Sequence, residues 1–441
     1  MITLRNYQGK KVGIVGLAKS GIATVASLIA SECDVYVWDD SEEKRQAFWH
    51  SSASVKTHMN DPQTWPWNKF HALVLSPGVP LTHPEPHYTV KMARDAGVRV
   101  VGDIELFCEA QHNTQKIAIT GTNGKSTTTS LIAHILQSVG RKVAAGGNLG
   151  TPVLALPPLA SDGCYVLELS SYQLDLVQAA HFNISLLLNM TPDHIDRHGS
   201  MERYVTAKSH IFDRQNRYDF ALIGIDDDYS RSVYAELKQK SKAQLIAISR
   251  LNPLKQGVFV DKEGILHDKI DPANPAAIKL YDIINLTGRH NWQNAAFAYA
   301  ACKAYGLTTR DIEKGLRSYP GLRHRLQIVA TIHGVRFIND SKATNADATS
   351  HALTPFSHVY WIAGGKPKEG GIESLAPYFE SINHAFLIGE AERAFAKTLE
   401  GRVPYTICGS LANAFDAAAK KSVCRSPAEC RGAAFPGLCV L

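Results

Sequence analysis

The residues best suited to chemistry in this chain lie in one short segment whose types and spacing suit the binding of nucleotide phosphates. Residues 116–128 read KIAITGTNGKSTT, in which three apolar residues predict the end of a buried strand. A glycine-rich turn over 120–124 follows, and Lys125 opens a predicted helix. In such a strand–loop–helix unit, backbone N–H groups and the helix N-terminus surround phosphate oxygens. We therefore expect Lys125 to reach the terminal phosphates and Ser126 or Thr127 to hold Mg²⁺.

The spacing of this loop departs from the usual phosphate-binding motif, because Ile119 stands where that motif has its first glycine. The alternative interpretation is an ordinary turn before a helix. The run Gly-Lys-Ser-Thr directly after a strand favours phosphate binding over that alternative.

Acidic residues and a histidine follow two further predicted strands. Residues 165–167 and 184–188 are short apolar runs that predict buried parallel strands. Glu168 follows the first run, and His194 lies beyond the second with aspartates close by. Because open α/β sheets bind ligands at the carboxyl ends of their strands, we expect an oxygen-rich site for Mg²⁺ there. The alternatives are a helix cap for Glu168 and a structural role for His194.

The elements that must position these residues form three consecutive α/β units, over residues 1–110, 111–319 and 320–441. The chain of 441 residues is long enough for two or three domains, and Pro320-Gly321 marks the clearest boundary. Hydrophobic residues make up 45% and charged residues 20%, as in soluble globular proteins. No apolar run reaches the ~18 residues of a membrane helix, and the first residues lack a signal-peptide core. The eight cysteines form no Cys-x-x-Cys pair, which fits reduced thiols in a cytoplasm. The net charge of +6 decides little about partners.

The first unit carries a glycine turn between two predicted strands. KVGIV over 11–15 and DVYVW over 34–38 are the strands, and residues 16–21 are the turn before the connecting helix. This arrangement resembles a dinucleotide-type βαβ unit with Ala18 in place of the middle glycine. A structural turn and a nucleotide-phosphate site are equally consistent with it. Asp39, at the end of the second strand, is a candidate to bind a ribose hydroxyl.

Two further features have ordinary structural interpretations on spacing alone. Residues 204–212 predict an amphipathic helix with Lys208 on its polar face, where a lysine is usually solvated. Residues 286–294 open another helix, with Asn291 and Asn294 one turn apart on one face. Two amides at a helix start can read the edge of a base, but capping is their more frequent use.

The third unit ends two predicted strands in polar clusters. The strand at 335–338 runs into NDSKATN over 339–345, and the strand at 359–363 runs into GGKPK. Another strand is predicted at 385–388. Polar clusters at adjacent strand ends indicate a second binding face.

Together these motifs resemble the Mur ligase family, in which they occur in the same order. They are TGTNGKST at 120–127, ELSSYQ at 168–173, Asp193-His194, Ala207-Lys208, GRHN at 288–291 and LRHR at 322–325. The NDSKATN cluster is similar to that of the members that add D-glutamate to UDP-N-acetylmuramoyl-L-alanine. The resemblance extends to about residue 420. It implies a Rossmann-like domain that binds the UDP substrate, a central ATP-binding domain, and a C-terminal Rossmann-like domain that binds the amino acid and part of ATP.

The resemblance also implies an ATP-dependent ligase reaction in peptidoglycan precursor synthesis. ATP phosphorylates the alanyl carboxylate to an acyl phosphate, which the amine of D-glutamate then attacks. The catalytic residues so implied are Lys125, Glu168, His194 and Lys208. Two Mg²⁺ ions are implied, with ligands among Ser126, Thr127, Glu168, His194 and Lys208. An ammonium group cannot ligate Mg²⁺, but in the family the matching lysine carries a CO₂-derived carbamate, so the resemblance contradicts the solvated interpretation of Lys208.

The binding residues follow by the same analogy. Those implied for ATP are Gly121, Thr122, Asn123, Gly124, Lys125, Ser126, Thr127, Asn291, Asn294, Arg325 and Asp340. Those implied for the UDP substrate are Lys19, Ser20, Asp39, Asp40, Asn148 and Gln173, with His194 also near its muramoyl-alanine part. Thr344 and Lys368 are implied for D-glutamate. The expected partners are these small molecules, with no nucleic acid and no membrane, and the expected state is a cytoplasmic monomer.

The end of the chain departs from the family pattern. From about Lys420 the sequence KKSVCRSPAECRGAAFPGLCVL predicts no helix or strand. Codons for residues 432–441, read one nucleotide later, can spell a Ser-Pro-Ala-Cys-Ala-Ser-Phe segment typical of the family. We therefore expect a frameshift near 420–423, real or in the sequencing, that truncates the C-terminal domain; the alternative is a diverged tail.

Two other functions compete with the D-glutamate ligase. One is another amide ligase, either a sister Mur ligase or a folylpolyglutamate synthetase. The NDSKATN cluster argues against the sisters, and the first unit argues against the folate enzyme. The other is a catalytically impaired nucleotide-binding product of a frameshifted gene, against which the intact residues Lys125, Glu168, His194 and Lys208 argue.

Overall fold

The computed structural model divides the chain into two compact units. One comprises residues 1–282 and 289–318, and the other comprises 283–288 and 319–441. The structure describes residues 1–148, 150–273, 275–286, 288–322, 324–332, 334–343, 345–354, 356–367, 370–423 and 438–440. Among these residues, every helix is too short or too polar to span a bilayer.

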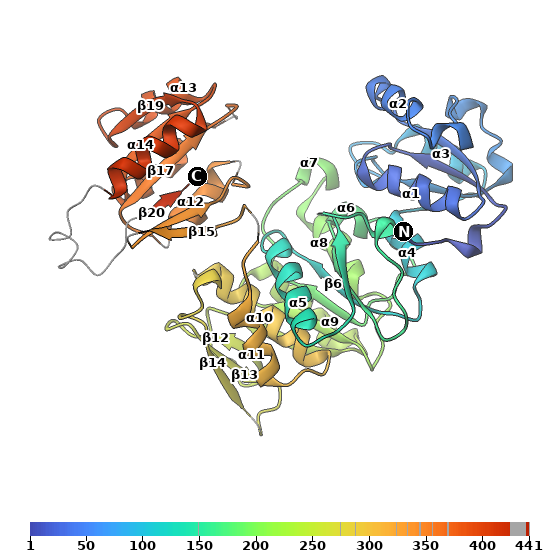
Figure 1. Ribbon diagram of the computed structural model, residues 1–441. Helices are drawn as coiled ribbons and strands as arrows, with labels where there is room; N and C mark the ends of the chain where they lie inside the picture. Colours follow the sequence, from blue (N-terminus) through green and yellow to red (C-terminus); the bar gives the residue numbers. More distant parts are fainter. Residues whose placement is uncertain are drawn as a thin grey trace. The chain divides into compact units, whose positions relative to one another are not determined.

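The first unit begins with a parallel sheet of five strands in the order β3-β2-β1-β4-β5, which belongs to the blue part of the chain in Figure 1. The strands are β1 (Lys11–Val15), β2 (Asp34–Trp38), β3 (Thr57–His58), β4 (Phe70–Leu75) and β5 (Arg99–Val101). Its helices are α1 (Lys19–Ala30), α2 (Glu42–Trp49), α3 (Tyr88–Asp95) and α4 (Asp103–Ala110). The connections run in opposite directions from β1 and β4, so the loops after these two strands form the crevice where such sheets bind ligands.

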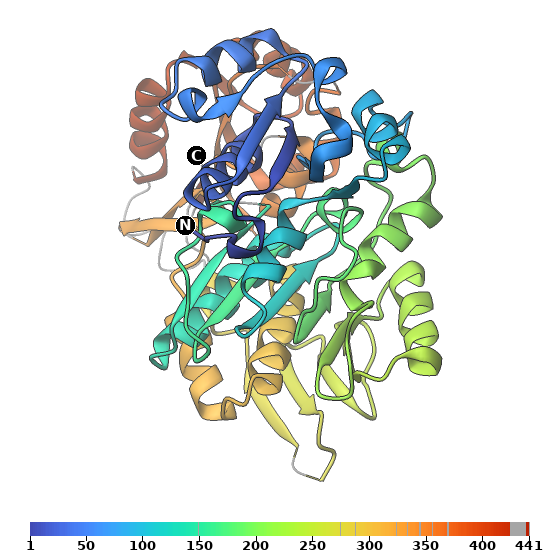
Figure 2. The same ribbon diagram turned by 90° about the vertical axis from the view of Figure 1, so that its right-hand side faces the viewer.

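The same unit contains a sheet of nine strands in the order β14-β13-β12-β11-β10-β9-β6-β8-β7. The strands are β6 (Gln115–Thr120), β7 (Val143–Gly147), β8 (Cys164–Glu168), β9 (Ile184–Leu187), β10 (Phe220–Gly224), β11 (Gln244–Ser249), β12 (Gly257–Val260), β13 (Ile265–Lys269) and β14 (Ala276–Lys279). In this order, all strands from β12 to β7, β6 included, are parallel. Strand β13 is antiparallel to both β12 and β14, and these three strands form the outer edge, yellow in Figure 2. The predicted buried strands at 165–167 and 184–188 are confirmed as β8 and β9.

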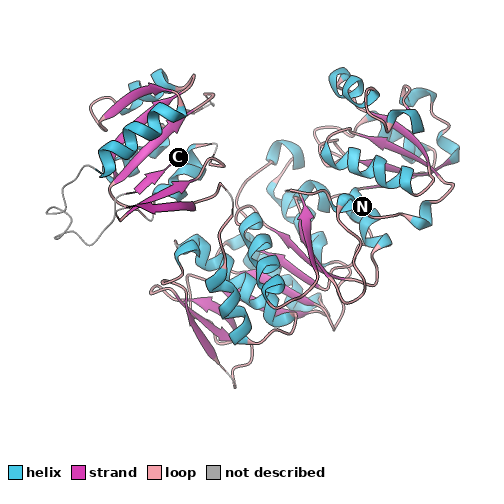
Figure 3. Cartoon of the chain, viewed as in Figure 1, coloured by secondary structure: helices cyan, strands magenta, loops and turns pink. Residues whose placement is uncertain are grey.

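Helices cover this sheet and connect its parallel strands, as the colouring of Figure 3 shows. They are α5 (Lys125–Ser138), α6 (Ser171–Leu174), α7 (Ile195–His198), α8 (Met201–Ser209), α9 (Asp228–Lys240), α10 (Arg289–Ala304) and α11 (Thr309–Ser318). Helix α5 packs against α10 and α11. Its apolar face explains this packing, because Leu131, Ile132 and Ile135 are fully buried. Strand β6 therefore runs through the middle of the sheet into a helix that other helices hold in place.

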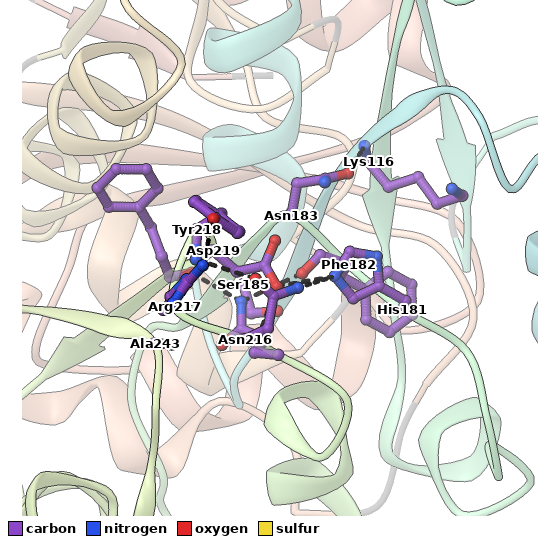
Figure 4. Close-up of polar contacts among 12 residues, drawn as sticks. Lys116, His181, Phe182, Asn183, Ser185, Asn216, Arg217, Tyr218, Asp219 and Ala243 are labelled. Atoms are coloured by element: carbon purple, nitrogen blue, oxygen red, sulfur yellow. Dashed lines mark hydrogen bonds and ion pairs between the residues drawn. The ribbon is translucent and has the colours of Figure 1, made fainter.

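A polar network closes the amino ends of β6, β9 and β10 (Figure 4). The Asp219 carboxylate accepts hydrogen bonds from His181 Nε2 at 2.8 Å and from the backbone N–H of Asn216 at 2.7 Å. Asn183 Oδ1 accepts one from the backbone N–H of Lys116 at 3.0 Å. These bonds tie the residues that precede β9 and β10 to one another and to β6.

The second unit is a sheet of six strands in the order β15-β16-β20-β17-β18-β19. Its strands are β15 (Gln327–Ile332), β16 (Val335–Asn339), β17 (Val359–Gly364), β18 (Ile382–Ile388), β19 (Tyr405–Gly409) and β20 (Leu438–Val440), and its helices are α12 (Ala346–Leu353), α13 (Glu392–Leu399) and α14 (Leu411–Val423). Strand β15 is antiparallel to β16, and the other pairs are parallel. The three strands predicted here, at 335–338, 359–363 and 385–388, are confirmed.

The prediction that no helix or strand follows Lys420 is wrong at two places. Helix α14 continues to Val423, and Lys421 Nζ lies 2.9 Å from His384 Nδ1 of β18, so packing on the sheet sustains the helix. Residues 438–440 form β20, which pairs with both β16 and β17. The error arose because a strand of three residues carries no periodicity that a sequence pattern can reveal. Residues 424–437, where most of the expected aberrant tail lies, are outside the described residues.

Candidate active site

The glycine-rich loop after β6 has the backbone conformation that phosphate binding requires. Gly124 adopts a left-handed conformation with φ of +86°, directly before the first residue of α5. A Cβ at this position would lie 2.3 Å from Asn294 Oδ1, so only glycine fits. Asn189, which follows β9, holds the loop from the other side, because its Oδ1 accepts the N–H of Asn123 at 2.9 Å. The loop is thus shaped by β9 and α10 before any ligand binds.

Lys125, Ser126 and Thr127 form the first turn of α5, as predicted. The Lys125 ammonium donates to the carbonyl oxygens of Gly121 and Thr122, both at 2.8 Å. It therefore lies folded over the same loop whose N–H groups would meet phosphate oxygens. Ser126 and Thr127 are partly buried. A cation, two hydroxyls and a helix N-terminus meet here, a combination suited to a nucleotide polyphosphate.

Glu168 ends β8 beside the start of this loop, because β6 and β8 are neighbours and Ile119 pairs with Glu168. Its side chain is 3% exposed, and its Oε1 accepts a hydrogen bond from Asn148 Nδ2 at 3.0 Å. The alternative of a helix cap is wrong, since Ser170 caps α6 in a capping box with Gln173. A buried carboxylate at the end of a central strand is available for a cation.

Lys208 is buried, with 2% of its surface exposed, so the interpretation as a solvated lysine is wrong. Its Nζ donates to the carbonyl oxygen of Gly121 at 2.9 Å and lies 4.7 Å from the centre of the Tyr204 ring. Burial, with the nearby charge of Lys125, lowers the pKa of Lys208 to about 7, and the charge of Asp193 opposes this. The helical pattern was right, but α8 turns this polar residue toward the carboxyl ends of the strands.

His194 and its surroundings form a third side of the site. His194 has a positive φ of 52° and its Nε2 lies 3.4 Å from Asp193 Oδ2. Its ring centre is 5.0 Å from that of Tyr172, and about half of the side chain is exposed. The strained backbone places an accessible imidazole beside a carboxylate. A histidine with only a structural role would not need such an exposed position, so we interpret His194 as a site residue.

His198 is a site residue that the sequence did not single out. It is buried, its Nε2 lies 2.9 Å from Ser171 Oγ, and its ring stacks on that of Tyr172 with 5.5 Å between the centres. Burial lowers the pKa of His198 to about 4, and the positive charges of Arg197 and Lys208 act in the same direction. The signal was its spacing, four residues after His194 and hence about one helical turn away.

Asn291 and Asn294 do not cap α10, contrary to the expectation from their pattern. Both are buried inside the helix, which begins at Arg289. Asn294 Nδ2 donates to Asn291 Oδ1 at 3.3 Å, and Asn294 Oδ1 accepts from Thr128 Oγ1 at 3.4 Å. The pair therefore lies against α5, immediately behind the phosphate-binding loop.

A pocket of about 490 Å³ lies at the crevice of the five-stranded sheet. The loop after β7 and Gln173 of α6 also line it. All six residues expected at the UDP substrate line it, namely Lys19, Ser20, Asp39, Asp40, Asn148 and Gln173. Asp39 is held in place, because its two oxygens accept the backbone N–H groups of Leu17 at 2.7 Å and Ser41 at 2.9 Å. Asn148 connects this pocket with the phosphate-binding loop, since it also donates to Glu168.

The glycines of the first turn have a packing reason as well. A Cβ on Gly21 would lie 1.8 Å from the carbonyl oxygen of Gly16, so α1 can approach the turn this closely only without a side chain. Structural and binding interpretations of this turn are therefore compatible, because the close approach builds one wall of the pocket.

Two of the residues expected at ATP lie close together in the second unit. Asp340 is buried after β16, and its Oδ1 accepts the N–H of Leu326 at 2.9 Å. Burial raises the pKa of Asp340, while the charge of Arg325 lowers it. Arg325 is exposed and is available to a ligand. Thr344 and Lys368, expected at D-glutamate, lie outside the described residues.

The donor set beside the phosphate-binding loop partly fits Mg²⁺. The hydroxyls of Ser126 and Thr127 and the carboxylate of Glu168 are hard oxygen donors, which suit this ion. No cluster of three acidic, histidine or cysteine ligands is preformed among the described residues. Lys208 fits as a ligand only after a reaction that gives it oxygen atoms, because an ammonium has no lone pair.

Three family models match successive parts of the chain. "Mur ligase MurD-like, N-terminal domain" matches residues 10–102, "Mur ligase middle domain" matches 119–302, and "Mur ligase, glutamate ligase domain" matches 324–425. Among curated relatives, the UDP-N-acetylmuramoylalanine--D-glutamate ligase of Paramagnetospirillum magneticum is 48% identical over 96% of this chain and 90% of the relative. The enzyme of the same name from Rhizobium meliloti is 46% identical over 94% of this chain and 88% of the relative.

Solved structures of Mur ligases share the fold. UDP-N-acetylmuramate-alanine ligase MurC from Thermotoga maritima has a TM-score of 0.55 at 16% identity, and covers 98% of this chain and 94% of its own. MurF from Acinetobacter baumannii has a TM-score of 0.59 at 17% identity, and covers 100% and 89%. At these identities the likeness concerns the fold alone.

Proposed function

The chain belongs to the Mur ligase family, and from this premise we propose that it is an ATP-dependent ligase that joins D-glutamate to UDP-N-acetylmuramoyl-L-alanine in peptidoglycan precursor synthesis. Relatives that carry this activity in their name are 43–48% identical to it over nearly its whole length. The structural observation that carries the proposal is that Glu168, which pairs with Ile119, and Lys208, which donates to the carbonyl oxygen of Gly121, both lie beside the start of the phosphate-binding loop. The carboxyl ends of the central strands thus carry a nucleotide site, an acidic ligand and a buried amine.

The reaction has two steps with separate demands. In the first, an oxygen of the alanyl carboxylate forms a bond to the γ-phosphorus of ATP, and the bond between that phosphorus and the β–γ bridging oxygen breaks to release ADP. In the second, the amine of D-glutamate forms the C–N bond to the acyl carbon, and the C–O bond to phosphate breaks. The amine loses a proton to the surrounding solvent. Because phosphoryl transfer spreads negative charge over several oxygens, catalysis depends on positioning and on cations.

The chain supplies both the positioning and a cation. Lys125 already lies on the loop that would hold the phosphates, so little rearrangement is needed to bring its charge to the γ-phosphoryl group. Asn148 spans from the substrate pocket to Glu168, which would bring the alanyl end of the substrate next to the nucleotide. We assign ATP to residues 121–127 together with Asn291, Asn294, Arg325 and Asp340.

We propose that Mg²⁺ is held by Ser126 or Thr127 with Glu168, and a second ion by His194 with a carbamate on Lys208. Mg²⁺ would neutralise the charge that develops on the transferred phosphoryl group. A pKa of about 7 supports the carbamate, because a substantial share of the Lys208 amine is then uncharged, the form that attacks CO₂. ¹³C-bicarbonate should give a carbamate signal in the NMR spectrum of the wild type that is absent from Lys208→Met; equal spectra would contradict this assignment.

The remaining assignments follow the family. We propose domains over residues 1–110, 111–319 and 320–441 that bind the UDP substrate, ATP, and the amino acid with part of ATP. Thr344 and Lys368 would hold the carboxylates of D-glutamate, since a hydroxyl and an ammonium suit an anionic amino acid. We further propose that the protein acts in the cytoplasm as a monomer.

The decisive experiment is phosphate release by the purified chain with ATP, Mg²⁺ and UDP-N-acetylmuramoyl-L-alanine. D-glutamate is compared with L-glutamate, glycine and L-lysine. We expect release with D-glutamate alone. Release with a different amino acid would replace the substrate assignment by that of another Mur-type ligase. Absence of release with any of them, repeated after the expected reading frame at 420–441 is restored, would contradict the proposed function.

A further inference from the structure

One wall of the substrate pocket is a long loop of the first sheet. This loop, residues 76–87, connects β4 to α3, and its first residues line the pocket. At its start, Ser76 Oγ donates to the carbonyl oxygen of Gly16 at 2.7 Å. At its end, His87 Nε2 lies 2.9 Å from Asp40 Oδ2. The part between these two contacts contains neither helix nor strand, so side chains that reach its backbone must set its position.

Arg197 of α7 holds the middle of the 76–87 loop. Its Nη2 donates to the carbonyl oxygen of Val79 at 3.0 Å, and its Nη1 donates to that of His83 at 3.2 Å. Arginine suits this task, because its planar guanidinium presents several N–H donors in a fixed geometry. The end of α7 also touches the loop, since a Cβ on Gly199 would lie 2.9 Å from His83 Nδ1. One side chain of the central sheet thus fixes a wall of the pocket.

The same arginine is joined to His194. The backbone N–H of Arg197 donates to the carbonyl oxygen of His194 at 3.1 Å. Arg197 Cζ lies 5.3 Å from the centre of the Tyr172 ring, and that centre is 5.0 Å from the centre of the His194 ring. The Nε atom of Arg197 is buried without a hydrogen-bond partner among the described residues, so the loop carbonyls and the Tyr172 ring place the guanidinium at the expense of one donor. Arg197 therefore connects the pocket wall with the start of α7.

We propose that Arg197 is a positioning residue, which fixes the pocket wall relative to His194 so that the two ends of one substrate molecule fit at the same time. The uridine diphosphate end of the substrate occupies the pocket, while its alanyl carboxylate must meet the γ-phosphorus of ATP. Because phosphoryl transfer requires close and aligned reacting atoms, a small shift of the wall displaces the carboxylate from its line of attack. This inference rests on the proposed function, because it takes the pocket to be that of the UDP substrate.

The test compares Arg197→Met with the conservative Arg197→Lys. Because Arg197→Met removes both hydrogen bonds to the loop, KM for UDP-N-acetylmuramoyl-L-alanine should rise about 5- to 10-fold. The value of kcat should fall about 10-fold, because the carboxylate is aligned less well. KM for ATP should stay within about twofold, since the phosphate-binding loop keeps its own support from Asn189. Arg197→Lys, whose single ammonium group replaces the two-armed guanidinium, should give intermediate values.

Arg214→Met is the matched control. Arg214 also uses two nitrogens on a backbone carbonyl, because its Nε and Nη2 donate to the oxygen of Gln178 at 3.1 and 2.9 Å. Gln178 is not among the residues that line the pocket. Arg214→Met should therefore keep KM for both substrates and kcat within about twofold of the wild type. The inference is overturned if Arg197→Met leaves KM for the UDP substrate unchanged, or raises KM for ATP by the same factor.

A double-mutant cycle with Gly199→Ala shows whether the effect runs through the contact of α7 with the loop. The added Cβ would press on His83 and displace the loop while Arg197 is still present. Gly199→Ala alone should raise KM for the UDP substrate, and it should add little in the Arg197→Met background. A rise of the same factor in both backgrounds would contradict a shared route. Gly199→Ala and Arg197→Lys also serve if Arg197→Met fails to fold.

Failure of the proposed function is recognised separately. Hydrogen exchange of the protein without ligands should be faster over the 76–87 loop in Arg197→Met than in the wild type and Arg214→Met, and equal exchange would overturn the inference. Calorimetric titration with UDP-N-acetylmuramoyl-L-alanine measures the pocket without turnover. A wild type that binds this ligand but adds no D-glutamate would contradict the function alone. The ratio of its affinity to that of Arg197→Met then decides the inference, since about 5 to 10 supports it and a value near one overturns it.

Discussion

Buried ionisable groups have different surroundings at the two ends of the nine-stranded sheet. At the amino ends, Asp219 accepts hydrogen bonds from His181 and Asn216, and the contacts close the strands against one another. At the carboxyl ends, Lys208 is buried against a carbonyl oxygen and close to another lysine, with its pKa lowered to about 7. The first arrangement stabilises the fold, whereas the second costs stability and holds the pKa of an amine well below its ordinary value. The difference indicates which end the chain uses for chemistry.

The largest effect that this comparison predicts is on catalysis at the carboxyl end. Lys125→Ala removes the cation that lies on the phosphate-binding loop. Loss of an oriented charge at a phosphoryl group should lower kcat/KM about 10²- to 10³-fold. Phosphate release dependent on D-glutamate measures it. A loss below about fivefold would mean that Lys125 serves the loop and not the phosphates.

The amino end should show the opposite behaviour. Asp219→Ala leaves His181 and a backbone N–H without their acceptor, which should lower the free energy of unfolding by about 1–3 kcal/mol. Because the network lies at the far ends of the strands, kcat should not change. Urea unfolding and the phosphate assay measure the two quantities on one preparation. A fall in kcat without a fall in stability would break the comparison.

The pH dependence of stability should also come from the carboxyl end. The pKa of His198 in the folded chain, about 4, lies below its ordinary value of 6.5, so the unfolded chain binds more protons between these values. Its contribution to stability is complete above pH 6.5 and is lost as the pH falls through 4. We expect a loss of about 1–2 kcal/mol that His198→Gln removes, measured by urea unfolding at pH 7.5, 5.5 and 4.5. The exposed His112→Gln is the control and should keep the wild-type slope.

The smallest effect is expected from an exposed ion pair that precedes β7 and β8. Lys142 and Asp162 form an exposed ion pair at 3.1 Å. Solvent screens such a pair, so Lys142→Ala should change the free energy of unfolding by less than about 0.5 kcal/mol and leave kcat unchanged. The same urea and phosphate measurements apply. A larger effect would show that charge on this surface matters in a way that the comparison of the two ends ignores.

The sequence predicted most of what local pattern controls. Strand and helix periodicity predicted β1, β6, β8 and α5, and the motif order predicted the family. The burial of side chains was harder to predict from the sequence. Lys208 lies on the polar side of an amphipathic pattern, yet α8 packs that side against the strand ends, and only tertiary structure reveals this.

Contacts between residues that are distant in the sequence also could not be predicted from the sequence pattern. The contact of Asn294 with Thr128 joins residues 166 positions apart, so the expectation of a helix cap could not anticipate it. Motif analogy named six residues that line one pocket, because it carries such tertiary information indirectly.

The position of β20 has a consequence for how the second unit is made. Leu438 pairs with Arg336 on one side and Val359 on the other, so a late segment occupies the middle of a sheet whose other strands are synthesised before it. Until it emerges from the ribosome, β16 and β17 each present an unpaired backbone edge to other nascent chains. Its insertion must also close long loops, which slows folding. We therefore expect this unit to be the part of the newborn protein that depends most on chaperones.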